Sequence, residues 1–489
     1  MTVRVRIAPS PSGHLHVGNV RSALFNWLFA RHLDGTFLVR IDDTDRARSE
    51  QQYIDDILAG LRWLGLDWDE GYEVGGPHGS YLQSDRFARY QEVAADLLER
   101  GLAYRDFRSS EELEELRTRA QKEKLPPAFY IRRPDDYHAD AASARVQEGE
   151  AAVIRFSVPQ GVPIEFTDVV RDEMSFESHV VDDFVILRSD GSPTYHLAST
   201  VDDVDYEITH VARGEDLLSS TPKHILITEA MGADRAVYAH LPLLFGPDGK
   251  KLSKRHGDTS LRAYREAGYL PDAMFNYMSL LGWSIGPDVE VFSRDEAVAA
   301  FDLDDVQKSP AVFDVEKLGW MNGLYIRAMD DETFGRAALA STELELGRDL
   351  DEDERDRLAY LSVHVQERVK FLSEIGPSVR FAFEPIAYDE AAWKKTMKGD
   401  AGRALEAAIA TLRELPAWEL EAIESALRAM LETEQLSARK GLQPLRVAVT
   451  GSNVSPPLYE SMVAAGRSTV LDRIESSLGR LASEAADLG

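Results

Sequence analysis

The chain has 489 residues, no cysteine, and 84 acidic against 55 basic side chains, which gives a formal net charge of −29. The lack of cysteine excludes disulfides and thiolate zinc sites, and no apolar run approaches the roughly 18 residues that a membrane span needs. The 44% hydrophobic content and the length suit about three to five globular domains. Residues 1–6 lack the apolar stretch of a secretory signal, so we expect a soluble, cytoplasmic protein with no membrane partner.

The negative charge argues against a nucleic-acid partner, because phosphates attract basic surfaces. An acidic chain can still bind RNA if its cations gather locally. Two basic clusters could serve this purpose: Lys250, Lys251, Lys254, Arg255 and His256, and then Arg439, Lys440 and Arg446.

The first hundred residues are predicted to alternate strands and helices. Residues 3–8 and 36–41 have the character of strands, and from Val20 the apolar residues fall on helical spacing. Further helices are expected at 51–64 and 81–105. This order favours a parallel sheet covered by helices.

The segment 105–190 differs in character. Residues 109–113 carry the start signal of a capped helix. Short β-type runs follow at 152–158, 164–170 and 184–188. We interpret 105–190 as an inserted α+β domain. The α/β pattern then returns with a strand at 209–213, a helix at 217–231 and a strand at 237–244.

Beyond residue 261 leucine, alanine, glutamate and arginine recur at helical spacing. Weak breaks fall near Pro310, Pro377 and Pro416. We predict all-α modules in this half. Composition alone is equally compatible with amphipathic helices that only pack against each other.

The first candidate site is the segment Pro9–Asn19, between a predicted strand and helix. Gly13 and Gly18 would permit tight turns, and the start of the helix would present free backbone N–H groups to a phosphate. His16 stands where an imidazole N–H could reach a phosphate oxygen. The alternative is an ordinary strand-to-helix turn. The segment has no G-x-G-x-x-G pattern, so a dinucleotide cofactor is not indicated.

The second candidate is Lys250–Arg255, which follows a turn at Gly246–Gly249. Its cationic and hydroxyl side chains suit a polyphosphate. The spacing is not that of a P-loop, because Leu252 stands where serine or threonine should follow the lysine. The alternative is a solvated basic turn.

Together the two motifs resemble the signatures of class I aminoacyl-tRNA synthetases, with residues 16–19 as the "HIGH" element and residues 251–255 as the "KMSKS" element. The interval between them leaves room for the inserted domain of that class. Further segments resemble bacterial glutamyl-tRNA synthetase, so the resemblance extends over nearly the whole chain. These segments are residues 6–13, 23–27, 40–45, 193–198, 213–216, 320–323 and 450–452.

The resemblance implies a Rossmann-type catalytic domain in two halves, 1–104 and 191–260, around an acceptor-binding insertion at 105–190. It implies a helical stem-contact domain at 261–325, followed by two helical anticodon-binding domains at 326–376 and 377–489. The family joins ATP and L-glutamate into glutamyl-adenylate and transfers the glutamate to the 3′ end of tRNA(Glu). Members generally need tRNA for the first step, some also charge tRNA(Gln), Mg²⁺ accompanies the ATP, and most are monomers.

The resemblance also assigns candidate site residues. His16 and Lys254 are the expected catalytic residues. ATP is expected to contact Pro9, Ser10, Gly13, His16, Gly18, Asn19, Lys251, Ser253, Lys254 and Arg255. Glutamate is expected to contact Arg6, Ala8, Ser10, Asp42, Tyr195, Ser199 and Arg213, with the arginines and Tyr195 on its side-chain carboxylate and Asp42 on its ammonium group.

Three departures from the family pattern are visible. Asp42 and Ser199 stand where the family usually has glutamate and asparagine. The stretch 104–108, where some relatives carry a zinc site, has no cysteine, so neither zinc nor any other resident metal is expected. Arg368 and Arg446 are weak candidates for reading the anticodon.

Four alternatives remain open. They are a glutaminyl-tRNA synthetase, an enzyme that glutamylates a modified tRNA base, a catalytically silent tRNA-binding relative, and an unrelated adenylyltransferase. The predicted helical half opposes the first two and the last, because glutamine enzymes carry β-barrels there and the others lack such a half. The intact motifs around His16 and Lys254 oppose the silent relative.

Overall fold

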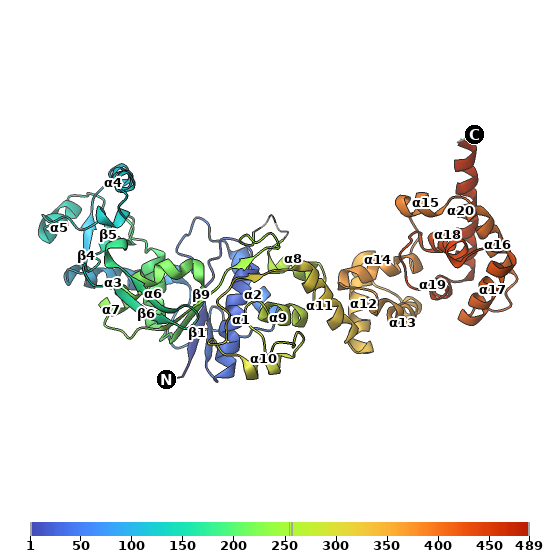
Figure 1. Ribbon diagram of the computed structural model, residues 1–489, viewed down its shortest axis with the longest axis horizontal. Coiled ribbons are helices and arrows are strands. Elements are labelled where there is room, and N and C mark those ends of the chain that lie inside the picture. The colour runs from blue at the N-terminus through green and yellow to red at the C-terminus, as the bar shows by residue number, and fades with distance from the viewer. Residues whose placement is uncertain (1, 254, 256–257, 488–489) are drawn as a thin grey trace. The chain divides into compact units, whose positions relative to one another are not determined.

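The fold is described from a computed structural model, which defines residues 2–253, 255 and 258–487. The chain divides into two compact units (Figure 1). The first consists of Met1–Arg265 and Pro271–Val315, and the second of Glu266–Leu270 and Glu316–Gly489. Over the described residues, no helix is both long enough and apolar enough to cross a membrane.

The first unit begins with a parallel sheet, as predicted. Its strands are β1 (Arg4–Ile7), β2 (Thr36–Val39) and β3 (Glu70–Gly71). The intervening helices are α1 (Val17–His32) and α2 (Gln51–Trp63). Helix α1 contacts β1, β2 and also two later helices, α9 (Pro271–Ser279) and α10 (Arg294–Ala300). This enclosure explains why α1 is buried on all sides rather than amphipathic.

A second sheet has the order β7-β6-β10-β9. Strands β9 (His210–Gly214), β10 (Val237–Leu241) and β6 (Ile164–Asp168) are parallel, and β7 (Asp172–Phe176) returns antiparallel to β6. Strand β9 lies beside β1, because the backbone N–H of Thr209 donates to the carbonyl of Arg4 at 3.0 Å. Helices α6 (Tyr195–Asp205) and α7 (Thr221–Ala230) pack against each other in this part of the unit.

The predicted insertion contains its own antiparallel sheet of β4 (Ala103–Asp106), β5 (Val153–Phe156) and β8 (Val185–Leu187). Its helices are α4 (Ser110–Glu123), which has the predicted capping box of Ser109 and Glu112, and α5 (Ala139–Gln147). Short 3₁₀ turns lie at Pro127–Phe129 and Ser178–Val180. The segment is not wholly separate from the catalytic part, because β6 pairs with β10.

Two predicted helices were too long. The one expected at 81–105 is a 3₁₀ turn (Gln83–Arg86) and α3 (Phe87–Glu99), and the chain then enters β4. Gly101 has a φ of +69°, which ends the helix in the left-handed conformation that glycine tolerates. The helix expected at 217–231 begins as a 3₁₀ turn (Glu215–Ser220) before α7, whose first turn holds a proline.

The later part of the chain is helical, as predicted, apart from the short pair β11 (Leu244–Phe245) and β12 (Ala311–Val312). Pro377 itself lies in the first turn of the short helix α14 (Ile375–Val379), where a missing N–H costs little, and the breaks lie at 367–371 and 383–389 on either side of it. The remaining helices are α8 (Leu261–Glu266), α11 (Val315–Arg327), α12 (Asp331–Leu346), α13 (Glu352–Gln366), α14 (Ile375–Val379), α15 (Glu390–Thr396), α16 (Ala401–Arg413), α17 (Leu420–Thr433), α18 (Ala438–Thr450), α19 (Leu458–Ala465) and α20 (Arg467–Asp487), with 3₁₀ turns at Leu372–Glu374 and Arg380–Ala382.

Candidate active site

A cleft of about 490 Å³ lies where β1 and β9 end and α1 begins. The carboxyl ends of neighbouring strands in an α/β sheet are the usual place for a ligand. Twelve of the predicted site residues line this cleft: Arg6, Ala8, Pro9, Ser10, His16, Gly18, Asn19, Asp42, Tyr195, Ser199, Arg213 and Lys251. Residues from two motifs that are distant in the sequence therefore line the same cleft.

His16 is the N-cap of α1. Its Nδ1 accepts a hydrogen bond of 3.0 Å from the backbone N–H of Gly18. Burial, together with nearby Lys251, lowers the pKa of His16, so its ring is neutral at pH 7. Since Nδ1 is the acceptor, the ring proton must lie on Nε2. His16 can therefore donate one hydrogen bond without carrying a charge.

The predicted free N–H groups at the start of α1 are not free. Val17 donates to the carbonyl of Thr259 at 3.0 Å, Gly18 to the His16 ring, and Asn19 to the His16 carbonyl at 2.9 Å. The prediction was wrong because the capping histidine and the segment around Thr259 use these donors. Phosphate binding at this helix must then depend on His16 Nε2 and the positive end of the helix dipole.

The two glycines of the first motif are predicted to permit tight turns and a close approach of the backbone. Neither Gly13 nor Gly18 has a positive φ. A Cβ on Gly18 would lie 3.3 Å from His16 Nδ1, whereas a Cβ on Gly13 would meet nothing within 4 Å. Gly18 therefore gives room to the capping histidine, and Gly13 does not line the cleft.

The second motif contributes two described residues to the cleft, Leu252 and Lys251, and Lys251 Nζ lies 3.5 Å from the carboxylate of Asp216. Ser253 and Arg255 do not line it, and Arg255 lies 3.6 Å from Asp248. Lys254, the predicted catalytic lysine, lies outside the residues that the structure describes.

Arg213 is a buried cation with neutral neighbours. It is 4% exposed. Among the described residues no carboxylate forms an ion pair with it. All five of its N–H groups have a neutral partner. Nε contacts His240 Nε2 at 3.2 Å, and Nη1 contacts Tyr195 Oη at 3.1 Å and His224 Nδ1 at 3.3 Å. Nη2 contacts Thr221 Oγ1 at 2.8 Å and the Leu217 carbonyl at 3.3 Å. A buried charge without a counter-ion is costly, so the site is arranged to receive an anion.

Arg6 was predicted to have the same role, but its surroundings differ. Its Nε and Nη2 donate to the two carboxylate oxygens of Asp203, each at 3.0 Å. This is a bidentate ion pair, which already compensates the charge of the guanidinium. Arg6 lines the cleft without supplying an unpaired charge.

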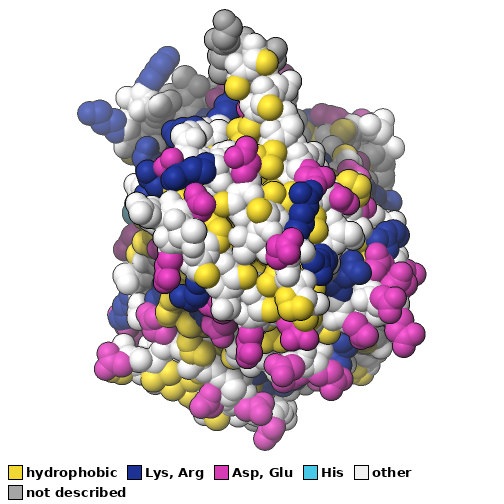
Figure 2. Space-filling model, turned by 90° about the vertical axis from the view of Figure 1, so that its right-hand side faces the viewer, with side chains coloured by type: hydrophobic (Ala, Val, Ile, Leu, Met, Phe, Trp, Pro, Cys, Tyr) yellow, Lys and Arg dark blue, Asp and Glu magenta, His cyan; other side chains and the backbone are white. Residues whose placement is uncertain are grey.

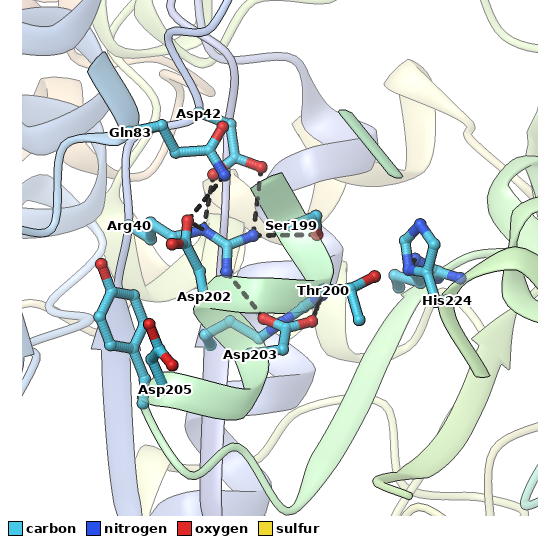
Figure 3. Close-up of polar contacts among 12 residues, drawn as sticks. Arg40, Asp42, Gln83, Ser199, Thr200, Asp202, Asp203, Asp205 and His224 are labelled. Atoms are coloured by element: carbon cyan, nitrogen blue, oxygen red, sulfur yellow. Dashed lines mark hydrogen bonds and ion pairs between the residues drawn. The ribbon is translucent and has the colours of Figure 1, made fainter. Parts of the chain in front are cut away.

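A network centred on Arg40 borders the cleft through Asp42 and Ser199, and sequence reasoning did not find it. Arg40 is fully buried and donates to Asp42 at 2.6 and 3.2 Å, to Asp203 at 2.7 Å and to Ser199 Oγ at 3.1 Å. Figure 3 shows these three side chains directed at the Arg40 guanidinium. A helical signal was available, because Ser199 and Asp203 are four residues apart and share a face of α6.

Asp42 was expected to bind an ammonium group. Burial, and the nearby charges of Asp202 and Asp203, outweigh Arg40 and raise the pKa of Asp42 to about 6. It is therefore ionised at neutral pH, but both of its oxygens also face Arg40. Any ammonium group must share this carboxylate with Arg40.

Arg21 is a second cation that sequence reasoning missed. It comes from α1, lines the cleft and is 3% exposed. Its Nη groups donate to the carbonyls of Leu281 and Pro242, whereas its buried Nε has no hydrogen-bond partner among the residues that the structure describes. Burial lowers the pKa of Arg21 to about 10, so it stays charged at neutral pH. The only hint in the sequence was an arginine early in a helix that is mostly apolar.

The predicted cationic cluster near the C-terminus does not form a free basic patch. Lys440 pairs with Asp400 at 3.0 Å, and half-buried Arg446 donates to Ser455 Oγ at 2.5 Å and to the Pro456 carbonyl at 2.7 Å. Burial lowers the pKa of Arg446. On the face drawn in Figure 2, lysine and arginine side chains stand among many acidic ones.

Comparison with known proteins agrees with this geometry. Residues 2–320 match the family model described as tRNA synthetases class I (E and Q), catalytic domain, and residues 336–478 match an anticodon binding domain. The chain is 43% identical over 486 residues to a glutamate–tRNA ligase of Dehalococcoides mccartyi, and 43% identical over 493 residues to one of Streptomyces coelicolor. Each match covers 98% of both chains.

A solved structure is also similar over its full length. It is the crystal structure of a glutamate tRNA ligase from Elizabethkingia meningosepticum in complex with its amino acid. Its TM-score is 0.83 at 32% identity, covering 98% of this chain and 100% of that chain. The fold is thus a class I synthetase catalytic domain with parallel sheets, followed by an all-helical anticodon-binding region. Within that class, the chain belongs to the glutamate–tRNA ligase family.

Proposed function

We propose that this protein activates L-glutamate with ATP and transfers it to the 3′ end of tRNA(Glu), releasing pyrophosphate and then AMP. The observation that carries the proposal is the presence, in one cleft, of Arg213 without a counter-ion and of His16 with a neutral N–H donor. Arg213 suits the carboxylate of an amino-acid side chain, and the His16 donor suits a phosphate oxygen.

Glutamate would bind by its side-chain carboxylate to Arg213 and the Tyr195 hydroxyl, which lie 3.1 Å apart. A carboxylate would compensate the charge of the buried guanidinium, and its charge-assisted hydrogen bonds would replace contacts that Arg213 Nη1 now makes with neutral Tyr195 and His224. Glutamine would bring a neutral amide whose NH₂ faces N–H donors, so it would leave the charge uncompensated. Asp42 would accept from the ammonium group, and Ala8, Ser10 and Ser199 line the same cleft.

In the first step an α-carboxylate oxygen of glutamate would attack the α-phosphorus of ATP, a P–O bond would form, and the bond to pyrophosphate would break. The attacking carboxylate is ionised at neutral pH, so the step needs no general base. Catalysis would come from alignment and from stabilisation of charge on the phosphates. His16 Nε2–H would donate to a phosphate oxygen, and by its motif Lys254 would neutralise the α-phosphate and the leaving pyrophosphate.

The described residues contain no group of three or more His, Cys, Asp or Glu side chains that could hold a metal ion. We propose Mg²⁺ only as part of the MgATP substrate, and no step above depends on it.

In the second step a hydroxyl of the terminal ribose of tRNA would attack the glutamyl carbonyl, and AMP would leave. The insertion at 105–190 would hold the acceptor end, 261–325 the adjoining stem, and the helical segments 326–376 and 377–489 the anticodon. The catalytic halves would be 1–104 and 191–260. We expect a cytoplasmic monomer, with tRNA(Gln) as a second candidate substrate.

The test is charging of purified tRNA(Glu) and tRNA(Gln) transcripts with labelled glutamate or glutamine. Glutamate attached to tRNA(Glu) is the expected product. Glutamine attached to either tRNA would refute the proposed substrate, and charging of neither by a folded sample would favour a silent RNA-binding relative.

A further inference from the structure

Three buried side chains form a line across neighbouring strands beneath the cleft. Arg213 on β9 and His240 on β10 are direct register partners, and Asp168 ends the next strand, β6. Arg213 Nε lies 3.2 Å from His240 Nε2, and His240 Nδ1 lies 2.5 Å from Asp168 Oδ2. His240 and Asp168 do not line the cleft, and the mechanism above does not use them.

Asp168 determines which nitrogen of His240 carries the proton. Its Oδ1 accepts from the backbone N–H groups of Val170 at 3.0 Å, Arg171 at 2.9 Å and His240 at 3.1 Å. Although burial opposes it, the hydrogen bonds from His240 and the backbone lower the pKa of Asp168, so it is a carboxylate. A carboxylate beside Nδ1 requires a proton there, and Nε2 is left as the acceptor for Arg213.

The imidazole therefore separates Arg213 from a negative charge while still holding it. Arg6 shows the other arrangement, because Asp203 contacts its guanidinium directly with two hydrogen bonds of 3.0 Å. If Asp168 contacted Arg213 in that way, a substrate carboxylate would have no unpaired cation to bind. With His240 between them, Arg213 is oriented through Nε but keeps its charge uncompensated.

The other ring beside Arg213 is also neutral. His224, on α7, is 2% exposed and places Nδ1 3.3 Å from Arg213 Nη1. Burial and the charge of Arg213 hold the pKa of His224 well below its usual range. Each nitrogen contact of Arg213 with a histidine is thus made to a neutral acceptor.

We propose that His240, oriented by Asp168, is a positioning residue that presents Arg213 to the side-chain carboxylate of glutamate and so contributes to the choice of glutamate over glutamine. This inference depends on the proposed function. Failure of that function would appear in the wild type as no glutamate-dependent exchange, whereas failure of this inference would appear as wild-type kinetics in the variants.

The test is ATP–pyrophosphate exchange with saturating tRNA, in which the KM for glutamate and the KM for ATP are measured separately. His240→Leu removes the acceptor and should raise the KM for glutamate about 10- to 100-fold, the usual effect of losing a hydrogen bond to a buried charge. The KM for ATP should change less than about twofold. His240→Gln keeps an acceptor for Arg213 and should recover most of the loss. His210→Leu is the matched control, because His210 lies at the other end of β9, and its KM values should equal those of the wild type.

Asp168→Asn keeps the shape of the Asp168 side chain and is the second test variant, to be used if His240→Leu does not fold. The NH₂ group of the asparagine would favour the His240 tautomer whose proton is on Nε2. That proton would face the Nε–H of Arg213, so the hydrogen bond between them would be lost. The KM for glutamate should therefore rise about tenfold. A wild-type KM for glutamate in His240→Leu or Asp168→Asn would overturn the proposal. Equal losses for glutamate and ATP, or no recovery in His240→Gln, would likewise show that His240 only supports the fold.

Discussion

Asp203 binds Arg6 through two parallel hydrogen bonds of 3.0 Å, and Arg6 is thereby neutralised before any substrate arrives. Arg213 lines the same cleft with neutral partners only, among the residues described. The two arginines that the family resemblance treats alike therefore differ physically. We therefore expect Arg213 to select the carboxylate, and Arg6 to hold Asp203 in place.

Arg213→Gln should raise the KM for glutamate by at least about 30-fold, because truncating one member of a buried charge pair costs about 2–5 kcal/mol. The KM for ATP should stay nearly unchanged. Arg235→Gln, an exposed arginine that pairs with Glu229, is the control and should leave both constants as they are. Steady-state exchange kinetics measure this, and an unchanged KM for glutamate would remove Arg213 from the substrate site.

Arg6→Gln should act mainly on stability. It leaves the Asp203 carboxylate with Arg40 alone, and loss of one partner from a buried ion pair lowers the free energy of unfolding by about 3 kcal/mol. Urea denaturation measures this change. If stability is unchanged while the KM for glutamate rises as far as in Arg213→Gln, then Arg6 binds substrate directly and Asp203 does not neutralise it.

His16→Asn should separate the two functions of this histidine. The asparagine oxygen can take the place of Nδ1 as the N-cap acceptor, so the melting temperature should stay near that of the wild type. The donor on Nε2 is lost, and activation should slow by about 100- to 1000-fold, as when one donor to a transition-state oxygen is removed. A rate of glutamate activation close to the wild-type rate would exclude His16 from phosphate binding.

The raised pKa of Asp42 predicts a pH dependence. The value of kcat/KM for glutamate should fall as the pH decreases through about 6, because protonated Asp42 no longer attracts the ammonium group. Asp42→Asn should abolish this pH dependence, and a profile identical to that of the wild type would assign the dependence to another group.

The effect of Asp42 on the stability of the fold has the opposite sign. The folded-state pKa exceeds the unfolded value of 3.8, so this group stabilises most at low pH and its contribution is lost as the pH rises through 6.

Arg446→Ala should destabilise the second unit rather than weaken tRNA binding. The change leaves the Pro456 carbonyl and Ser455 without their donor, which costs about 1–3 kcal/mol. Thermal unfolding measures the loss, and exposed Arg439→Ala is the matched control. An increase of tenfold or more in the KM for tRNA, at unchanged stability, would instead place Arg446 on the RNA.

Sequence patterns predicted most elements of the first unit and the helical character of the rest, because both depend on local periodicity. They failed where one residue changes the backbone: Gly101 ends α3, and a proline delays α7. They also missed β7, whose short run of charged and apolar residues gives little β signal, and the pairing of β6 with β10, which depends on contacts distant in sequence.

The sequence could predict many of the residues that line the cleft, but not which side chains each of them contacts. The motifs indicated His16, Asp42 and Arg213, and these do lie together. No pattern could show that Asp203 neutralises Arg6, or that the start of α1 is already hydrogen-bonded, because each depends on which side chain arrives from a distant segment.

The most direct test of the assignment is ATP–pyrophosphate exchange with glutamate and with glutamine, each in the presence and absence of tRNA. We predict exchange with glutamate when tRNA is present, and none with glutamine, because a neutral amide cannot neutralise Arg213. Exchange driven by glutamine, or no exchange by a folded sample under any of the four conditions, would contradict it.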